Sequence, residues 1–177
     1  MRRYDRLILT GGLAALTLAG CASEQPSRRA AQRPPVVIRG IPVPASTYVR
    51  LASSSDLYEI KSSQLALTRA RDARLREFAR MMINAHQGLG SQLSFAGRRL
   101  NLLPSAQLLP EHQRLLDTLE STSDFDGTYR RQQIQVHEAA LKLHGDFAAR
   151  GESATLRPVA RSAAPIIRAH LQRLRAM

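Results

Sequence analysis

The chain has 177 residues, a length that suits one folded domain with a targeting segment. It carries 26 Lys or Arg against 14 Asp or Glu, so its formal net charge is +12 at neutral pH. Tryptophan is absent, aromatic residues are few, and Leu and Ala abound, which favours helices and predicts an all-α protein. The single cysteine, Cys21, excludes an internal disulfide and a metal site built from several thiolates.

Residues 1–20 have the layout of an export signal. Three arginines lie within the first six residues, and a short apolar run, Leu7 to Ala19, follows them. This run is too short to cross a bilayer as a permanent helix. The run ends in Leu-Ala-Gly-Cys, which resembles the lipobox of bacterial lipoproteins. That resemblance implies cleavage before Cys21 and acylation of its thiol. Ala22, in place of Asp, implies the outer rather than the inner membrane.

Residues 21–44 read as a disordered tether between this lipid anchor and the folded domain. The segment contains five prolines and several arginines, and it shows little apolar periodicity. The folded domain is therefore expected to span residues 45–177.

The first two helices are predicted on either side of Asp72. One should run from Ala45 or Ser46 to Ala70, but apolar residues fall on two of its sides and leave its buried face ambiguous. The next should be capped by Asp72 and end near Arg98 and Arg99. Its apolar stripe has helical spacing, with one polar member, His86; the stripe comprises Leu75, Ala79, Met82, His86, Leu89, Leu93, Ala96 and Leu100.

Residues 101–123 contain Pro104, Pro110 and a short helical piece, Glu111 to Leu119. The segment is too long for a tight helix hairpin and suits a crossover along a bundle. The third long helix should then begin at a capping pair, Ser123 and Asp126, and end at Arg150-Gly151. Its expected buried stripe is Phe125, Tyr129, Val136, Ala140, Leu143 and Phe147.

A fourth long helix is expected from Ser153 to Leu174. Pro165 lies inside it and should kink it or start it afresh. Its expected buried residues are Leu156, Val159, Ala163, Ile166 and His170.

Four segments together carry a family resemblance: EIKSSQLALTRA, FARMMINAHQ, FDGTYRRQQIQVHEAAL and PIIRAHL. Their order and spacing resemble the domain of unknown function 4142 family, over about residues 47–173. The resemblance implies an exported bacterial protein, loosely linked to stress adaptation, with a ferritin-like antiparallel four-helix bundle and no established activity. Relatives commonly carry a carboxylate two positions before the histidine of the second helix; here Asn84 stands there.

Helix geometry predicts that four polar side chains meet at mid-bundle. Glu59 and His86 are equally far in sequence from a turn at Asp72-Ala73, so both lie about 20 Å from it. His137 and His170 are likewise equally far from a turn at Ser153-Ala154.

Two interpretations of this layer remain open. Three imidazoles and one carboxylate can hold one Zn, Cu or Fe ion. A di-iron centre is excluded, because it needs Glu three residues before its histidines, and Ile83, Ile134 and Ile167 stand there. Alternatively the layer is structural, with Glu59 accepting hydrogen bonds from imidazoles and setting the helix register. His144 and His112 are weaker candidates, the first as an outer partner and the second as a solvated residue.

No nucleophilic triad, phosphate-binding loop or nucleic-acid platform is present in the sequence. We therefore expect a non-catalytic lipoprotein on the periplasmic side of the outer membrane, held there by acylated Cys21. The alternative is a metal-binding protein with one transition-metal ion and a redox role. The arginine-rich surface suits anionic lipid or an envelope polymer, or is simply a solvated face; it comprises Arg69, Arg71, Arg74, Arg76 and Arg80.

Overall fold

The computed structural model describes residues 42–177, which form five helices and contain no strand. The helices are α1 (Ala45–Arg69), α2 (Ala73–Arg98), α3 (Pro110–Ser121), α4 (Phe125–Arg150) and α5 (Arg157–Arg175). The prediction of an all-α protein is therefore confirmed. No helix in this range is long and apolar enough to span a bilayer. The predicted signal, the acylation site Cys21 and most of the tether lie outside the described residues.

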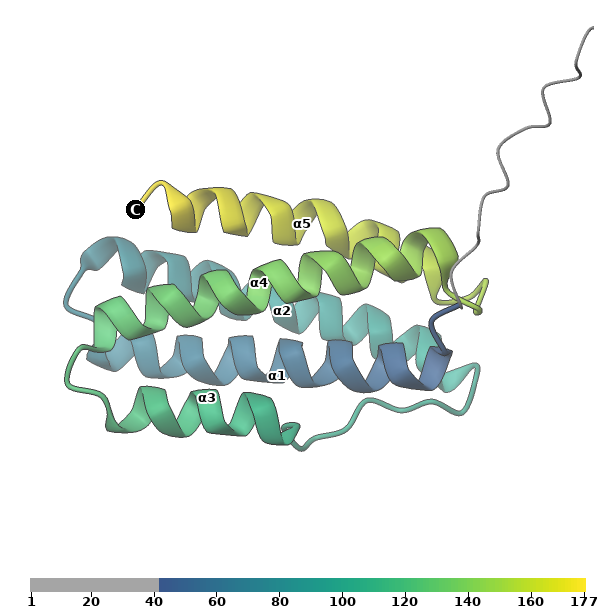
Figure 1. The fold of residues 1–177 in the computed structure, drawn as a ribbon, viewed down its shortest axis with the longest axis horizontal. Helices are drawn as coiled ribbons and strands as arrows, with labels where there is room; N and C mark the ends of the chain where they lie inside the picture. The colour runs from purple at the N-terminus through teal and green to yellow at the C-terminus, as the bar shows by residue number, and fades with distance from the viewer. Residues whose placement is uncertain (1–41) are drawn as a thin grey trace, which may run out of the picture. The chain divides into compact units, whose positions relative to one another are not determined.

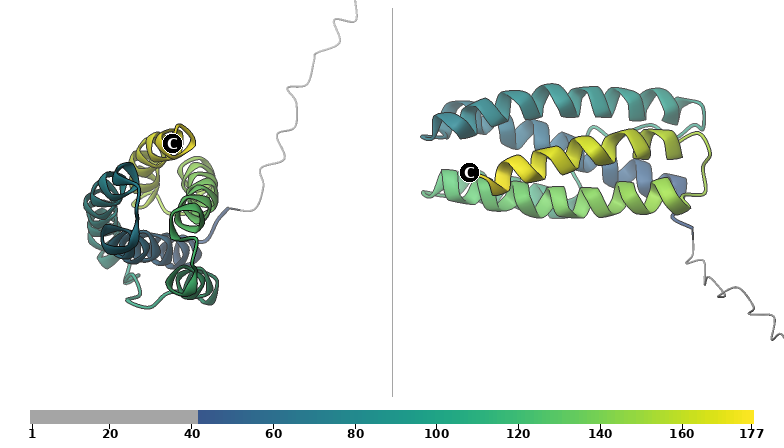
Figure 2. Two further views of the ribbon diagram at one scale, coloured as in Figure 1. Left: turned by 90° about the vertical axis from the view of Figure 1, so that its left-hand side faces the viewer. Right: turned by 90° about the horizontal axis from the view of Figure 1, so that it is seen from above.

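Helices α1, α2, α4 and α5 form a bundle in which each helix is antiparallel to its neighbours (Figures 1 and 2). The pairs α1–α2 and α4–α5 are hairpins, and α3 packs outside the bundle against α1 and α4. The segment between α2 and α4 returns the chain to the end where α2 begins. There the backbone N–H groups of Arg71 and Asp72 donate to the Asp126 carboxylate, at 3.0 and 2.8 Å. The ferritin-like bundle with its long crossover is thus confirmed.

The starts of α4 and α5 differ from those expected, whereas α2 starts as predicted. Asp72 caps α2 as predicted, since its carboxylate accepts from the Arg74 N–H at 2.8 Å. At α4 the cap is Asp124, which accepts from the Gly127 N–H at 3.2 Å, and not Ser123. The carboxylate of Asp126 cannot complete a capping pair there because it serves the α1–α2 turn.

Helix α5 begins four residues later than expected, at Arg157 rather than Ser153. Pro158 in its first turn suits this start, because a proline there lacks only an N–H that the helix would not use. The helix continues through Pro165, which is exposed to solvent. Leu156, Ala163 and His170 are buried as predicted, whereas Ala160 and Ile167 are buried in place of Val159 and Ile166.

The buried faces otherwise follow the helical patterns. The predicted stripe of α2 is buried except for Leu100, which lies beyond the end of the helix and is 36% exposed. Leu143 of α4 is only half-buried. Helix α1 has the broadest buried face, because it contacts α2, α3 and α4, and this explains why its apolar residues fall on two sides.

One arginine joins three helices at the end of the bundle where α4 begins. The guanidinium of Arg69 donates to the carbonyl oxygens of Leu119, Glu120 and Thr122, at 2.9, 2.6 and 2.9 Å. It also lies 4.8 Å from the ring centroid of Phe125. Arg69 therefore satisfies the free carbonyl groups at the end of α3 and fixes this end to α1.

Other members of the predicted arginine-rich surface are also engaged within the fold. Arg76 donates to the carbonyl oxygens of Ala70 and Arg71, at 2.7 and 2.9 Å, so it closes the α1–α2 turn rather than facing solvent freely. Arg74 pairs with Asp72 at 2.8 Å.

Replacing Arg69 should loosen α3. We expect Arg69→Ala to lower the free energy of unfolding by about 1.5–3 kcal/mol, the usual range for hydrogen bonds from a charged donor. Denaturant unfolding followed by circular dichroism measures this loss. Arg69→Lys should recover only part of it, because an ammonium cannot donate in a planar fork. Arg80→Ala removes an exposed arginine and serves as the control; equal stability of the two alanine variants would contradict the proposed clamp.

Candidate metal centre

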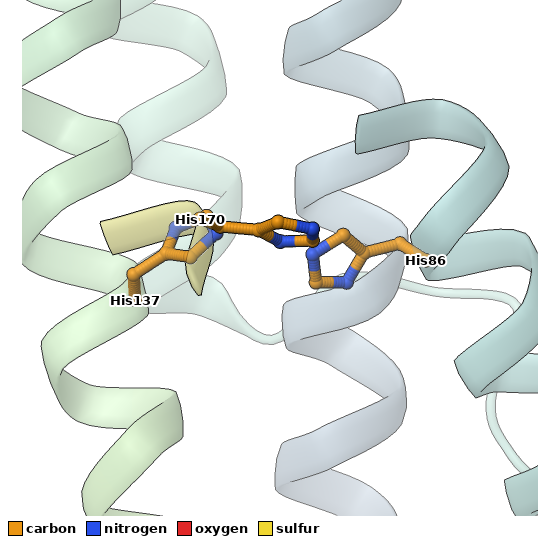
Figure 3. A group of neighbouring side chains, drawn as sticks. All are labelled: His86, His137 and His170. Atoms are coloured by element: carbon orange, nitrogen blue, oxygen red, sulfur yellow. The ribbon is translucent and has the colours of Figure 1, made fainter. Parts of the chain in front are cut away.

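Three imidazole rings meet in the middle of the bundle (Figure 3). They come from α2, α4 and α5 as His86, His137 and His170, and each residue is at most 5% exposed. One ligand nitrogen of each ring lies within 4.8 Å of those of the other two. The ring centroids are 5.6 to 5.8 Å apart. The imidazoles that were expected at mid-bundle are therefore brought together there.

Two of these rings are oriented by hydrogen bonds on their outer nitrogens. The Nδ1 of His86 is 2.8 Å from the Asp56 carboxylate, and the Nδ1 of His137 is 2.7 Å from the Gln133 carbonyl oxygen. When both partners accept, each Nδ1 carries the hydrogen, and an imidazole that is neutral in this tautomer has its lone pair on Nε2. Metal-binding histidines are typically held in this way, by a carboxylate or carbonyl group on the far nitrogen.

Three of the other four ring nitrogens of the cluster are buried without a hydrogen-bond partner. They are His86 Nε2, His137 Nε2 and His170 Nδ1. A buried polar atom without a partner costs about 1–3 kcal/mol, so three together need an explanation. A metal ion bound by the three lone pairs supplies one.

Glu59 lies next to this cluster on α1 and is 1% exposed. Its Oε1 is 3.2 Å from Nδ1 of His137, and that nitrogen is also 2.7 Å from the Gln133 carbonyl oxygen. Burial disfavours the charged carboxylate, but the adjacent His137 outweighs this effect, so the pKa of Glu59 lies below its usual range. Burial acts against a charged His137, but Glu59 prevails and raises the pKa of that imidazole. Glu59 is thus a buried negative charge beside the three rings.

Asp56 is a member of the site that the sequence analysis missed. It is 6% exposed, and burial raises the pKa of its carboxyl group, with His86 acting in the opposite direction. A signal was present in the sequence, because Asp56 precedes Glu59 by three residues and so lies on the same face of α1. The ambiguous buried face of this helix concealed it.

The two weaker histidine candidates lie outside the cluster. His144 is buried on the same helix two turns beyond His137, where its Nδ1 lies 3.0 Å from the Tyr48 hydroxyl oxygen. His112 was expected to be solvated but is half-buried: its Nδ1 is 2.7 Å from the Ser54 hydroxyl, and its ring stacks on Tyr58.

The geometry fits one metal ion better than a purely hydrogen-bonded layer. A structural layer would have Glu59 accept hydrogen bonds from the imidazoles, and the one imidazole nitrogen near it, Nδ1 of His137 at 3.2 Å, is shared with the closer Gln133 carbonyl oxygen. Bonds of 2.0–2.1 Å to one ion would place the ligand nitrogens about 3.3–3.6 Å apart. Since the ligand nitrogens lie within 4.8 Å of one another, the rings need to close by at most about 1.5 Å.

Comparisons with known proteins agree with the fold. The profile of a family described as "Domain of unknown function (DUF4142)" matches residues 40–177. A solved structure described as "CopM in the Cu(II)-bound form" is similar with a TM-score of 0.66 and 15% identity, over 77% of this chain and 96% of that one. "CopM in the Cu(I)-bound form" has a TM-score of 0.64 and 17% identity, over 75% and 93%. The sequence has no match among curated proteins.

The buried His144 predicts acid sensitivity of the metal-free fold. Burial, together with the nearby His86, lowers its pKa to about 4, against 6.5 for an ordinary imidazole. Between these values the unfolded chain binds more protons than the folded one, so stability falls as the pH falls. For this group alone we expect a loss of about 2 kcal/mol between pH 7 and pH 5.

Denaturant unfolding of the unaltered protein and His144→Gln at both pH values measures this increment. Glutamine can still accept from Tyr48 but does not titrate, so the variant should lose less stability on acidification. The same loss in both proteins would show that His144 is not the titrating group.

Proposed function

The chain belongs to the DUF4142 family, and on this premise we propose that it is an exported bundle protein that binds one transition-metal ion through His86, His137 and His170. The observation that carries the proposal is the convergence of three buried imidazoles, each with one ligand nitrogen within 4.8 Å of the others and each with a buried ring nitrogen that has no hydrogen-bond partner. Asp56 and Gln133 support it, since they already hold two of the rings in the orientation that a bound ion requires.

Copper is the ion that we propose. Imidazole ligands suit copper, zinc and iron, and among divalent ions copper binds such sites most tightly. The similar solved structures are of CopM with Cu(II) and with Cu(I). At 15% and 17% sequence identity these similarities support a common fold alone, so the copper assignment for this chain rests on its own three imidazoles.

The proposed role is binding rather than catalysis, in the cell envelope. Acylation of Cys21 would anchor the protein in the outer membrane, and residues 22–44 would connect the anchor to the bundle. Exposed arginines such as Arg71 and Arg80 would then favour anionic lipid or envelope polymers. A redox activity would require a further open coordination position on the metal.

A groove gives solvent access to the proposed site. Its volume is about 820 Å³, and α1, α2 and the crossover line it. Asp56 and His86 are among its lining residues, whereas His137 and His170 are not. An ion entering by this route would meet Asp56 and His86 first. Gly90 borders the path, since a Cβ atom there would lie 3.8 Å from Oδ2 of Asp56.

Metal titration of the purified, metal-stripped protein tests the proposal. We expect one equivalent of Cu(II) or Zn(II) per chain by calorimetry. Alanine at His86, His137 or His170 should weaken binding by more than about 100-fold, since it removes a ligand rather than an outer partner. His144→Gln should bind as the unaltered protein does. The proposal is wrong if the unaltered protein takes up no ion, or if the three alanine variants bind unchanged.

Filling the groove should slow exchange of the ion. We expect Gly90→Leu to reduce both the association and dissociation rates in stopped-flow measurements while leaving the equilibrium affinity close to that of the unaltered protein. Gly88→Leu is the matched control, because it adds the same side chain to the same helix at an exposed position with nothing within 4 Å of its Cβ. Equal rates for the two leucine variants would rule out this route.

A further inference from the structure

We infer that the turn at the end of α2, residues 95–103, is a membrane-contact surface: its apolar side chains enter the headgroup region of an anionic bilayer, and its two arginines bind the phosphate groups there. This inference rests on the proposed lipid anchor at Cys21 and adds the surface by which the bundle meets the membrane. Three features of the structure support it: the exposed apolar side chains of the turn, the backbone that holds them, and the charges beside them.

The exposed apolar residues of the fold gather in this turn. Within residues 42–177, the large hydrophobic residues that are exposed are Phe95, Leu100 and Leu103, at 71%, 36% and 67%. Single exposed apolar residues are common on protein surfaces, but a group confined to one turn indicates a contact surface. Phe95 also lies between two hollows, the groove beside α1 and a second one of about 440 Å³ beside α5. The packing of the bundle therefore leaves this ring uncovered.

Backbone hydrogen bonds fix the turn. The N–H groups of Asn101 and Leu102 donate to the carbonyl oxygens of Arg98 and Gly97, at 3.2 and 2.9 Å. Asn101 has a φ of 56°, and a left-handed residue with these two bonds is a common end of an α-helix. Gly97 permits the close approach, because a Cβ atom there would overlap the Leu102 carbonyl oxygen. Since Leu102 packs against the core, the next residue, Leu103, is held at the surface.

The two arginines of the turn are available to bind anions. Arg98 and Arg99 are exposed, and in the part of the chain that the structure describes neither forms an ion pair. At the other end of the bundle, Arg69 and Arg76 instead donate to backbone carbonyl oxygens. Basic residues close to an anionic bilayer are attracted to its headgroups. The turn thus combines apolar side chains with unpaired positive charge.

A lipid surface suits this combination better than a polymer or a second copy of the chain. An anionic polymer would bind the arginines but offers no apolar region for Phe95 and the leucines. Contact between two copies through this turn would bring their arginine pairs together, and like charges repel. In a bilayer the acyl boundary lies directly below the phosphate groups, so one surface receives both kinds of side chain.

The position of the turn agrees with the proposed anchor. Helix α1 begins at the same end of the bundle, where Ala45 packs in one apolar cluster with Leu93 and Ala96 of α2 (Figure 1). The chain that follows Cys21 therefore joins the bundle beside the turn. The other end of the bundle is about a helix length away, roughly 38 Å for the 25 residues of α1. An anchor at Cys21 would accordingly tether the bundle by the end that carries the apolar side chains.

Tryptophan fluorescence of the lipid-anchored protein tests the inference. The chain contains no tryptophan, so Phe95→Trp supplies a single reporter in the turn. The full chain is expressed in a bacterium that processes lipoproteins, and the product is reconstituted into vesicles of equal parts phosphatidylcholine and phosphatidylglycerol. We expect the emission to shift to the blue and to be quenched by brominated phospholipid.

Two further reporters keep the test decisive. Ala73→Trp is the matched control, because it adds the same side chain at an exposed position of α2, about 33 Å from Phe95. Its emission should remain that of an indole in water and should not be quenched. Leu103→Trp places the reporter beyond the helix and serves if Phe95→Trp does not fold.

Charge variants in the Phe95→Trp chain test the role of the arginines. Arg98→Gln together with Arg99→Gln should lower the ratio of docked to undocked protein about five-fold for each arginine removed, as measured from the quenched fraction. Arg71→Gln together with Arg80→Gln removes the same charge from exposed positions farther along the bundle and should have little effect. An equal loss in the two double variants would overturn the assignment to this turn.

The outcomes separate this inference from the anchor on which it rests. Lipid quenching of Phe95→Trp but not of Ala73→Trp supports the inference. An unquenched reporter in protein that floats with the vesicles overturns it and leaves the anchor in place. A blue shift that grows with protein concentration, without lipid quenching, shows contact between copies and also overturns it. Protein that does not float with the vesicles overturns both the anchor and the inference, whereas metal titration tests the metal site independently.

Discussion

The bundle is organised around a buried polar layer that hydrogen bonds alone do not satisfy. Such a layer is stable only if its groups find partners, because the surrounding core provides none. Asp56 and Gln133 satisfy one nitrogen each of His86 and His137, and this leaves the Nε2 atoms of both rings buried without a partner. The apolar clusters at either end of the bundle hold the helices at the height where these nitrogens converge. The packing of the helices therefore sets the positions of the three imidazoles that form the candidate site.

Residue counting along the helices was enough to predict where the histidines meet. In an antiparallel hairpin, two residues equally far from the turn lie at the same height, so His86, His137 and His170 could be placed without coordinates. Counting residues along a helix does not predict which side chains of other elements a residue contacts. The role of Asp126 depends on the neighbouring turn, and that of Asp56 depends on which side of α1 is covered. Local pattern fixes the height of a side chain, whereas packing decides its partner.

The two interpretations of the layer differ in what they require of Glu59. A structural layer needs it as an acceptor, and in the structure the nearest imidazole nitrogen, Nδ1 of His137, lies closer to the Gln133 carbonyl oxygen, at 2.7 Å, than to Glu59, at 3.2 Å. A metal layer needs it only as a negative charge near the ion, and its position beside His137 suits that role. The comparisons add a common fold with CopM but no residue correspondence, so the assignment depends on the chemistry of these side chains.

The arrangement of the three rings has a mechanical consequence. His86 belongs to the hairpin of α1 and α2, while His137 and His170 belong to the hairpin of α4 and α5. An ion held by all three is a cross-link between two halves of the molecule that are otherwise joined by a single covalent connection, the crossover. A bound ion would oppose separation of the two hairpins, so metal binding would stabilise the whole bundle against unfolding.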